Sequence, residues 1–250
     1  VASSVVTVDI VSVNVVPSTT TACIGSSVTL TANVTSGAAP YSYSWVGPNG
    51  FTSTDNPITI SNVSLSNSGT YSVIVTDSNN CTGMSSSDVN ISQLSVSVSP
   101  SLESVCVGST ITLTANVSGG TTPYSYQWTG PNGFTSTVNP LVINNATLSN
   151  AGTYQLTVTD INGCSGVSSA TVNVGQLNVL VSPAMEAVCI GSTITLTANP
   201  TGGVAPYTYQ WSGPNGFIST SNPAIINNAT LLDSGAYYVV VTDANGCSGS

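Results

Sequence analysis

The residues of this chain best suited to covalent chemistry are its six cysteines. The chain has no histidine, so two cysteines per period cannot complete a tetrahedral zinc site, and a catalytic thiol has no imidazole base. A constant separation of 58 residues instead predicts one disulfide in each period and an oxidising, extracellular compartment. The predicted pairs are Cys23–Cys81, Cys106–Cys164 and Cys189–Cys247.

Three aspartates are the acidic residues found in every period, namely Asp77, Asp160 and Asp243. Calcium needs about 6–8 oxygen ligands, so one carboxylate per period is a weak candidate for a metal site. The alternative, which we favour, is an aspartate that organises its own turn by accepting hydrogen bonds from the backbone. We therefore expect no metal and no cofactor. A hydrolase with paired carboxylates also has no repeated basis in this sequence.

Seven asparagines followed by any residue and then Ser or Thr are candidate glycosylation sites. Three of them occupy equivalent positions in the three periods. Two interpretations remain open: glycans that solubilise a surface poor in charge, or chance occurrences in a chain rich in Asn, Ser and Thr. The equivalent set is Asn62, Asn145 and Asn228, and the others are Asn33, Asn80, Asn90 and Asn116.

The charge composition excludes several classes of function. The 250 residues contain no Lys, Arg or His and nine acids, which gives a net charge of -9. Without cations the chain cannot neutralise phosphates, so we expect no nucleic-acid partner. No apolar run approaches the ~18 residues of a membrane helix, so we expect the chain not to span a membrane. No acid, base and nucleophile converge, so we expect no enzyme.

The elements that must position these residues repeat with a period of 83 residues. Residues 106–164 and 189–247 share 40 identities in 59 positions without a gap. Within a period, apolar and polar residues alternate in short runs such as Val28, Leu30 and Ala32, and turns such as Gly-Pro-Asn-Gly at 47–50 separate them. Alternation with a period of two predicts antiparallel strands with one buried face. The expected fold is all-β, with three tandem sandwiches in a linear array.

Each period resembles an immunoglobulin-like domain. Residues 28–32 resemble strand B, Trp45 resembles the buried strand-C tryptophan, and residues 68–73 resemble the tyrosine corner before strand F. Ala32 and Val73 stand where the core cysteines of such domains normally lie. The motifs Pro-Tyr-x-Tyr-x-Trp, Gly-Pro-Asn-Gly-Phe and Asp-x-Asn-x-Cys are similar to Ig-like repeats in large surface adhesins of gliding and related bacteria. That resemblance implies an exported protein of the cell surface whose units are strung together as a stalk.

The phase of the repeat predicts the domain boundaries. Residues 1–8 align with the last strand of a period, strand G, whereas the third period lacks that strand. Two explanations remain open: a window from a longer array, or subunits that polymerise head to tail. In the second case Val1, Val5, Val6 and Val8 complete the open sheet of a neighbouring copy beside residues 237–247. The predicted domains are 11–93, 94–176 and 177–250, with 1–10 as strand G of a preceding domain.

These features predict a structural extracellular protein that forms a surface filament or an adhesin stalk. The alternative is an adhesin module that binds environmental or host glycans, or another partner, through tyrosines at the domain rims. Phenylalanines after the Gly-Pro-Asn-Gly turns offer either an exposed docking stripe or packing under their own hairpins. The tyrosines are Tyr41, Tyr124 and Tyr207, and the phenylalanines are Phe51, Phe134 and Phe217.

Overall fold

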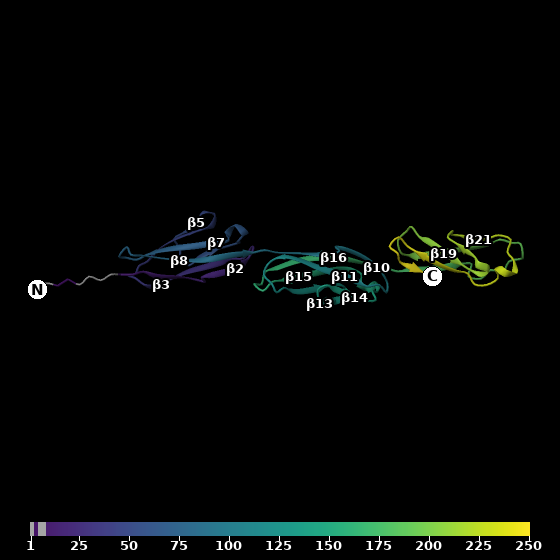
Figure 1. Ribbon diagram of the computed structural model, residues 1–250, viewed down its shortest axis with the longest axis horizontal. Helices are drawn as coiled ribbons and strands as arrows, with labels where there is room; N and C mark the ends of the chain where they lie inside the picture. The colour runs from purple at the N-terminus through teal and green to yellow at the C-terminus, as the bar shows by residue number, and fades with distance from the viewer. Residues whose placement is uncertain (1–2, 5–8) are drawn as a thin grey trace. The chain divides into compact units, whose positions relative to one another are not determined.

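Figure 1 shows the computed structural model of the chain, which describes residues 3–4 and 9–250. Its regular elements are β-strands and short 3-10 turns. The backbone divides into two compact units. The first comprises residues up to Val96 with Val117–Tyr126 and Thr157–Val167, and the second comprises Ser97–Asn116, Gln127–Leu156 and Ser168–Ser250. No described helix is long and apolar enough to cross a membrane.

The first repeat forms two sheets that face each other across an apolar core. One sheet has the strand order β1-β3-β6, and the other has the order β2-β8-β7-β4-β5. Their bounds are β1 (Ser12–Val16), β2 (Thr19–Cys23), β3 (Val28–Ser36), β4 (Ser42–Gly47), β5 (Phe51–Ser53), β6 (Ile58–Ile60), β7 (Gly69–Thr76) and β8 (Thr82–Ser92), with turns η1 (Pro48–Gly50) and η2 (Leu65–Asn67).

The second repeat has the same pattern, with sheets β14-β11-β9 and β10-β16-β15-β12-β13. Its elements are β9 (Leu94–Ser99), β10 (Leu102–Cys106), β11 (Ile111–Gly119), β12 (Ser125–Thr129), η3 (Pro131–Gly133), β13 (Thr135–Ser136), β14 (Leu141–Ile143), η4 (Leu148–Asn150), β15 (Gly152–Thr159) and β16 (Ser165–Gly175). The third repeat has sheets β17-β18-β21 and β20-β19-β22-β23. Its elements are β17 (Leu177–Ser182), β18 (Ile194–Gly202), β19 (Thr208–Ser212), η5 (Pro214–Gly216), β20 (Ile218–Ser219), β21 (Ala224–Ile226), η6 (Leu231–Asp233), β22 (Tyr238–Thr242) and β23 (Ser248–Gly249).

A proline moves the first strand of the repeat from one sheet to the other. Pro17 has no N–H to donate to a ladder, so pairing stops between β1 and β2. Before it, β1 pairs antiparallel with β3, and after it β2 pairs parallel with β8. This exchange gives the strand arrangement of an immunoglobulin-like sandwich, and β8 and β16 are its strand G.

The predicted core residues form the interior of the sandwich. Trp45 and Tyr71 are completely buried between the two sheets, together with Leu30. The Tyr71 hydroxyl donates to the carbonyl oxygen of Asn67 at 3.2 Å, which is the tyrosine corner expected from the sequence. The prediction of the core is therefore confirmed.

The third repeat departs from the other two along one edge. Strand β22 has five residues where β7 and β15 have eight, and β23 has two where β8 and β16 have eleven. Residues 185–189 form no strand, although the equivalent β2 and β10 do. Both losses have one cause, because β2 and β10 pair only with strand G.

Candidate functional site

The cysteines form two disulfides, and both correct the predicted pairing. Cys23 is bonded to Cys164 and Cys106 to Cys247, each across 141 residues of sequence. The first bridge lies within the first compact unit and the second within the second unit. Cys81 and Cys189 are free thiols. Each bridge therefore joins the first cysteine of one repeat to the second cysteine of the following repeat.

Strand G explains why the pairing within one repeat is wrong. Cys23 lies opposite Ser92 at the last residue of β8, whereas Cys81 immediately precedes Thr82 at its first residue. The 11 residues of β8 separate these two ends by about 33 Å, at about 3.3 Å per residue. Disulfides need Cα atoms within about 7 Å of each other, so this pair cannot close.

The partner of Cys23 comes from the turn that precedes the next strand G. After β8 the chain continues through Gln93, whose carbonyl oxygen accepts a hydrogen bond from the Gly120 N–H at 3.2 Å. A Cβ on Gly120 would lie 3.0 Å from a carboxylate oxygen of Asp160, so this junction lies against the turn 160–164. The end of one strand G and the turn before the next one thus lie together, and the bridge forms there.

The repeated aspartates organise these cysteine turns, as we favoured. One carboxylate oxygen of Asp160 accepts from the N–H groups of Asn162 (2.9 Å) and Cys164 (2.8 Å), and the other accepts from Thr121 (2.9 Å). Asp77 and Asp243 make the equivalent contacts. All three side chains are buried, and the described residues contain no cluster of three potential metal ligands. These carboxylates therefore serve the backbone around each second cysteine.

These hydrogen bonds predict that stability falls in acid. The Ala38 N–H and its neighbours hold the pKa of Asp77 below its ordinary value. Burial alone raises the pKa of Asp243, but hydrogen bonds from backbone N–H groups, including those of Val204 and Cys247, outweigh it and lower the pKa. A carboxyl with a depressed folded pKa stabilises the fold above its unfolded pKa, and that contribution disappears as pH falls through the folded pKa.

We therefore expect the unfolding temperature to be level between about pH 5 and 7 and to fall towards about pH 2. Protonation also relieves repulsion among nine acids, but separated surface charges are screened beyond about 10 Å at 0.1 M salt. Calorimetry at fixed ionic strength checks this. The variant Asp77→Asn/Asp243→Asn should start lower and depend less on pH. A melting temperature that rises in acid would contradict the prediction.

The recurrent asparagines have a backbone reason for their recurrence. Asn62, Asn145 and Asn228 adopt positive φ angles of 51°, 54° and 54°, a region that asparagine tolerates better than most residues. All seven candidate glycosylation asparagines are exposed, so their side chains are accessible. Their glycosylation stays a prediction.

The aromatic residues outside the core are engaged within their own repeats. Phe51 packs edge-to-face on Tyr71 with ring centroids 5.3 Å apart, and the equivalent pairs lie at 5.6 and 5.5 Å. Packing under the hairpin is therefore the correct alternative, and the docking stripe is wrong. The hydroxyls of Tyr41, Tyr124 and Tyr207 donate to carbonyl oxygens of Gly37, Gly119 and Gly202 at 2.9, 2.7 and 2.8 Å. Sugar binding by these half-buried rings stays a prediction.

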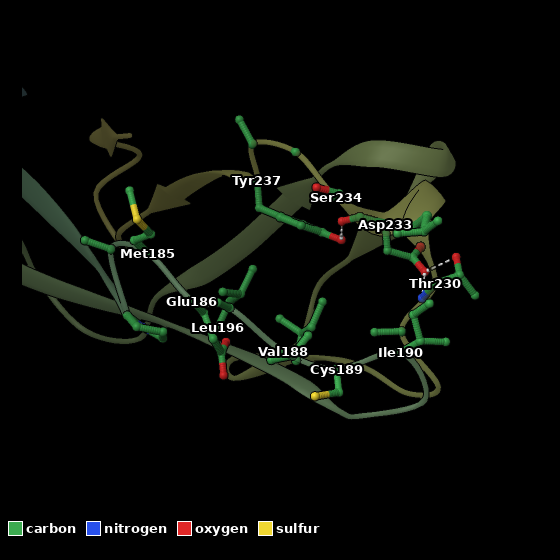
Figure 2. A pocket seen from close by; sticks show the side chains of 18 of the residues that line it. Met185, Glu186, Val188, Cys189, Ile190, Leu196, Thr230, Asp233, Ser234 and Tyr237 are labelled. Carbon is green, nitrogen blue, oxygen red and sulfur yellow. Dashed lines mark hydrogen bonds between the residues drawn. The ribbon is translucent and has the colours of Figure 1, made fainter.

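An open groove runs along the incomplete edge of the third repeat. Figure 2 shows its walls, with Met185, Val188 and Cys189 on one segment and Tyr237 with Asp233 on another. Its volume is about 730 Å³, and Leu196 and Ile194 also line it. Met185 is 91% exposed and Tyr237 is partly exposed, whereas the equivalent Tyr71 and Tyr154 are completely buried.

This groove is the place of the missing strand G. In the first repeat β8 lies between β2 and β7, pairing parallel with one and antiparallel with the other. In the third repeat, β23 pairs with β22 only at Val241–Gly249 and Thr242–Ser248. Among the described residues, fourteen are buried in the core of the first repeat and eight in that of the third. The open edge accounts for the smaller core.

The expected polymerisation strand lies almost wholly outside the described residues. Val1, Val5, Val6 and Val8 are among the residues whose placement the structure does not describe. Their pairing with a neighbouring sheet therefore stays a prediction.

One structural residue set was missed from the sequence. The side-chain amide of Asn56 accepts from the Ala32 N–H at 2.8 Å and donates to the Ala32 carbonyl oxygen at 2.9 Å. Asn139 and Asn222 do the same for Ala115 and Ala198. The available signal was an Asn-Pro pair at equivalent positions in all three repeats. The amide thus supplies strand-like hydrogen bonds beside the position where a core cysteine is normally found.

Comparison with known families and structures agrees with this fold. Residues 12–93 and 95–160 match models described as immunoglobulin domain, and residues 184–216 match the SprB repeat. The three N-terminal domains of the Highly Immunogenic Outer Capsid protein (Hoc) of bacteriophage RB49 are 17% identical, with a TM-score of 0.53 over 94% of this chain and 91% of that one. The four N-terminal Ig domains of Dscam1 isoform 6.44 are 16% identical over 98% and 72%, with a TM-score of 0.31. No curated protein sequence matches.

These findings establish an all-β fold of tandem Ig-like domains, an organisation that resembles cell-surface adhesion proteins. The SprB match suggests a cell-surface protein, and the disulfides are consistent with an extracellular location.

Proposed function

We propose that this chain is a structural extracellular protein whose Ig-like domains form a surface filament or adhesin stalk. Copies join head to tail when residues 1–9 of one copy enter the groove of the third repeat of another. The observation that carries this proposal is the groove itself, because it has the place and pairing partners of strand G. A heterologous contact of this kind generates an open filament.

The register of the first repeat predicts which donor residues face inward. In β8 the buried positions include Ser87, Val89 and Ile91, and one period earlier these become Ser4, Val6 and Val8. The exposed Asp88 corresponds to Val5. We therefore expect Val6 and Val8 to fill the groove against Tyr237 and Leu196, while Val5 faces solvent.

The test is the assembly of the full chain in a Cys81→Ser/Cys189→Ser background, where covalent coupling between copies cannot contribute. Sedimentation should show mass that rises with concentration. Val6→Asp should weaken the association at least about 100-fold, because an unpaired carboxylate buried in an apolar groove costs several kcal/mol and each 1.4 kcal/mol is a factor of ten.

Val5→Asp is the matched control, because an aspartate occupies that position in β8. It should assemble like the parent chain. A parent chain that remains monomeric at all concentrations, or equal weakening by both substitutions, would contradict the proposal.

The proposed role is architectural and needs no catalytic group. Disulfides that tie successive repeats together suit a protein that works outside the cell as a rigid array. Copies of the chain itself are therefore the proposed partners, and no observation favours glycan binding over assembly.

A further inference from the structure

The two free cysteines are the unused halves of a repeated bridge. Each observed disulfide joins a first cysteine to a second cysteine 141 positions later. Cys189 belongs to the first series and Cys81 to the second. Three periods are 249 residues, so Cys81 of a following copy lies 141 positions beyond Cys189 in the phase of the repeat.

We propose that Cys189 of one copy and Cys81 of the next copy form an intermolecular disulfide that repeats the two internal bridges. This inference rests on the head-to-tail joining proposed above, because docking of residues 1–9 brings the two cysteines together. In the expected register Asp9 lies beside Cys189, as Ser92 lies beside Cys23, and the first repeat of the incoming copy begins directly after it.

The turn that carries Cys81 is already built like those of the bonded cysteines. Its N–H donates to a carboxylate oxygen of Asp77 at 2.9 Å, and Cys164 and Cys247 make the same bond to their aspartates at 2.8 Å. The difference lies in exposure. Cys164 and Cys247 are 2% exposed, whereas Cys81 is partly exposed. The uncovered side of Cys81 is the side on which its counterparts meet a partner sulfur.

The turn after Cys189 is equally complete. The Ser192 N–H donates to the Cys189 carbonyl oxygen at 3.1 Å, and the Gly191 N–H donates to Ala229 at 2.8 Å. The bonded Cys23 and Cys106 have the same two hydrogen bonds at 3.0 and 2.7 Å. Only the strand that precedes Cys189 is missing, and the docked donor strand supplies its pairing partner.

The bond forms by thiol–disulfide exchange with a small disulfide such as oxidised glutathione. The exposed Cys189 thiolate attacks the oxidant, its S–S bond breaks, and one glutathione thiol leaves from a mixed disulfide. The Cys81 thiolate then attacks the Cys189 sulfur and displaces the second glutathione thiol. Two protein thiols are oxidised, and one glutathione disulfide is reduced.

Complementary single-cysteine variants test this pairing. Cys81→Ser and Cys189→Ser are each incubated alone and then mixed in a glutathione buffer, and the products are separated without reduction. The mixture should give a covalent dimer about 100-fold faster than either variant alone, because docking raises the effective concentration from micromolar to about millimolar. Peptic peptides, generated in acid to prevent exchange, should contain Cys81 linked to Cys189.

Sedimentation of the same samples separates this inference from the proposed function. Assembly of Cys189→Ser without covalent products supports independent strand docking. A mixture that assembles but forms no Cys81–Cys189 link overturns the disulfide and leaves the proposed function intact. Equal coupling of like cysteines in the single variants also overturns it. Absence of both assembly and coupling defeats both proposals.

Discussion

Replacing Cys23 and Cys164 together by serine is expected to lower the free energy of unfolding by about 5 kcal/mol. The bridge closes a loop across 141 residues, and the chain-entropy relation gives about this value for a loop of that length. The measurement is urea denaturation followed by tryptophan fluorescence, because each repeat carries one buried tryptophan.

The free cysteines supply the matched control for this experiment. Cys81→Ser and Cys189→Ser remove thiols that make no disulfide within the chain, so their effects should stay within about 0.5 kcal/mol. Pairing within each repeat would instead make Cys81→Ser as damaging as Cys23→Ser. That result, or an unchanged midpoint for the double variant, would contradict the observed connectivity.

Asp160→Ala is expected to destabilise the fold by about 3 kcal/mol. The substitution leaves three backbone N–H groups, those of Thr121, Asn162 and Cys164, without their acceptor. A buried donor without an acceptor costs about 1–3 kcal/mol, and the low end applies because water can enter the vacated space. Thermal and urea unfolding measure the loss.

Two comparisons show whether the carboxylate acts on its turn or on a metal. Asp55→Ala removes an exposed acid and should change stability by no more than about 0.5 kcal/mol. Calcium or a chelator should leave the parent chain unchanged, since Asp160 already accepts three backbone hydrogen bonds. A stability loss of Asp160→Ala that appears only with calcium present would contradict the turn role.

Local patterns predicted the parts of this fold that depend on local rules. Alternation around Leu30 places that residue in the core, and the spacing from Trp45 to Tyr71 identifies the Ig-like sandwich. The same phase argument predicted that the third repeat lacks strand G, and the groove beside Tyr237 is its structural expression.

The disulfide pairing could not be predicted because a periodic sequence is ambiguous. Separations of 58 and 141 residues differ by one period, so both satisfy the same series of cysteines. Only the length of β8 decides between them, since it holds Cys23 and Cys81 at opposite ends. The role of Asn56 was hidden for a related reason: its partner Ala32 is 24 residues away, and composition does not indicate the contact.

The two bridges interleave along the chain, since Cys106 lies between Cys23 and Cys164, and Cys164 lies between Cys106 and Cys247. Any single backbone cleavage between residues 23 and 247 therefore leaves both fragments covalently attached. Pairing within each repeat would leave the linkers near residues 93 and 176 as points where one cut separates the chain. A surface fibre exposed to proteases thus tolerates a nick in any repeat without shedding its outer part.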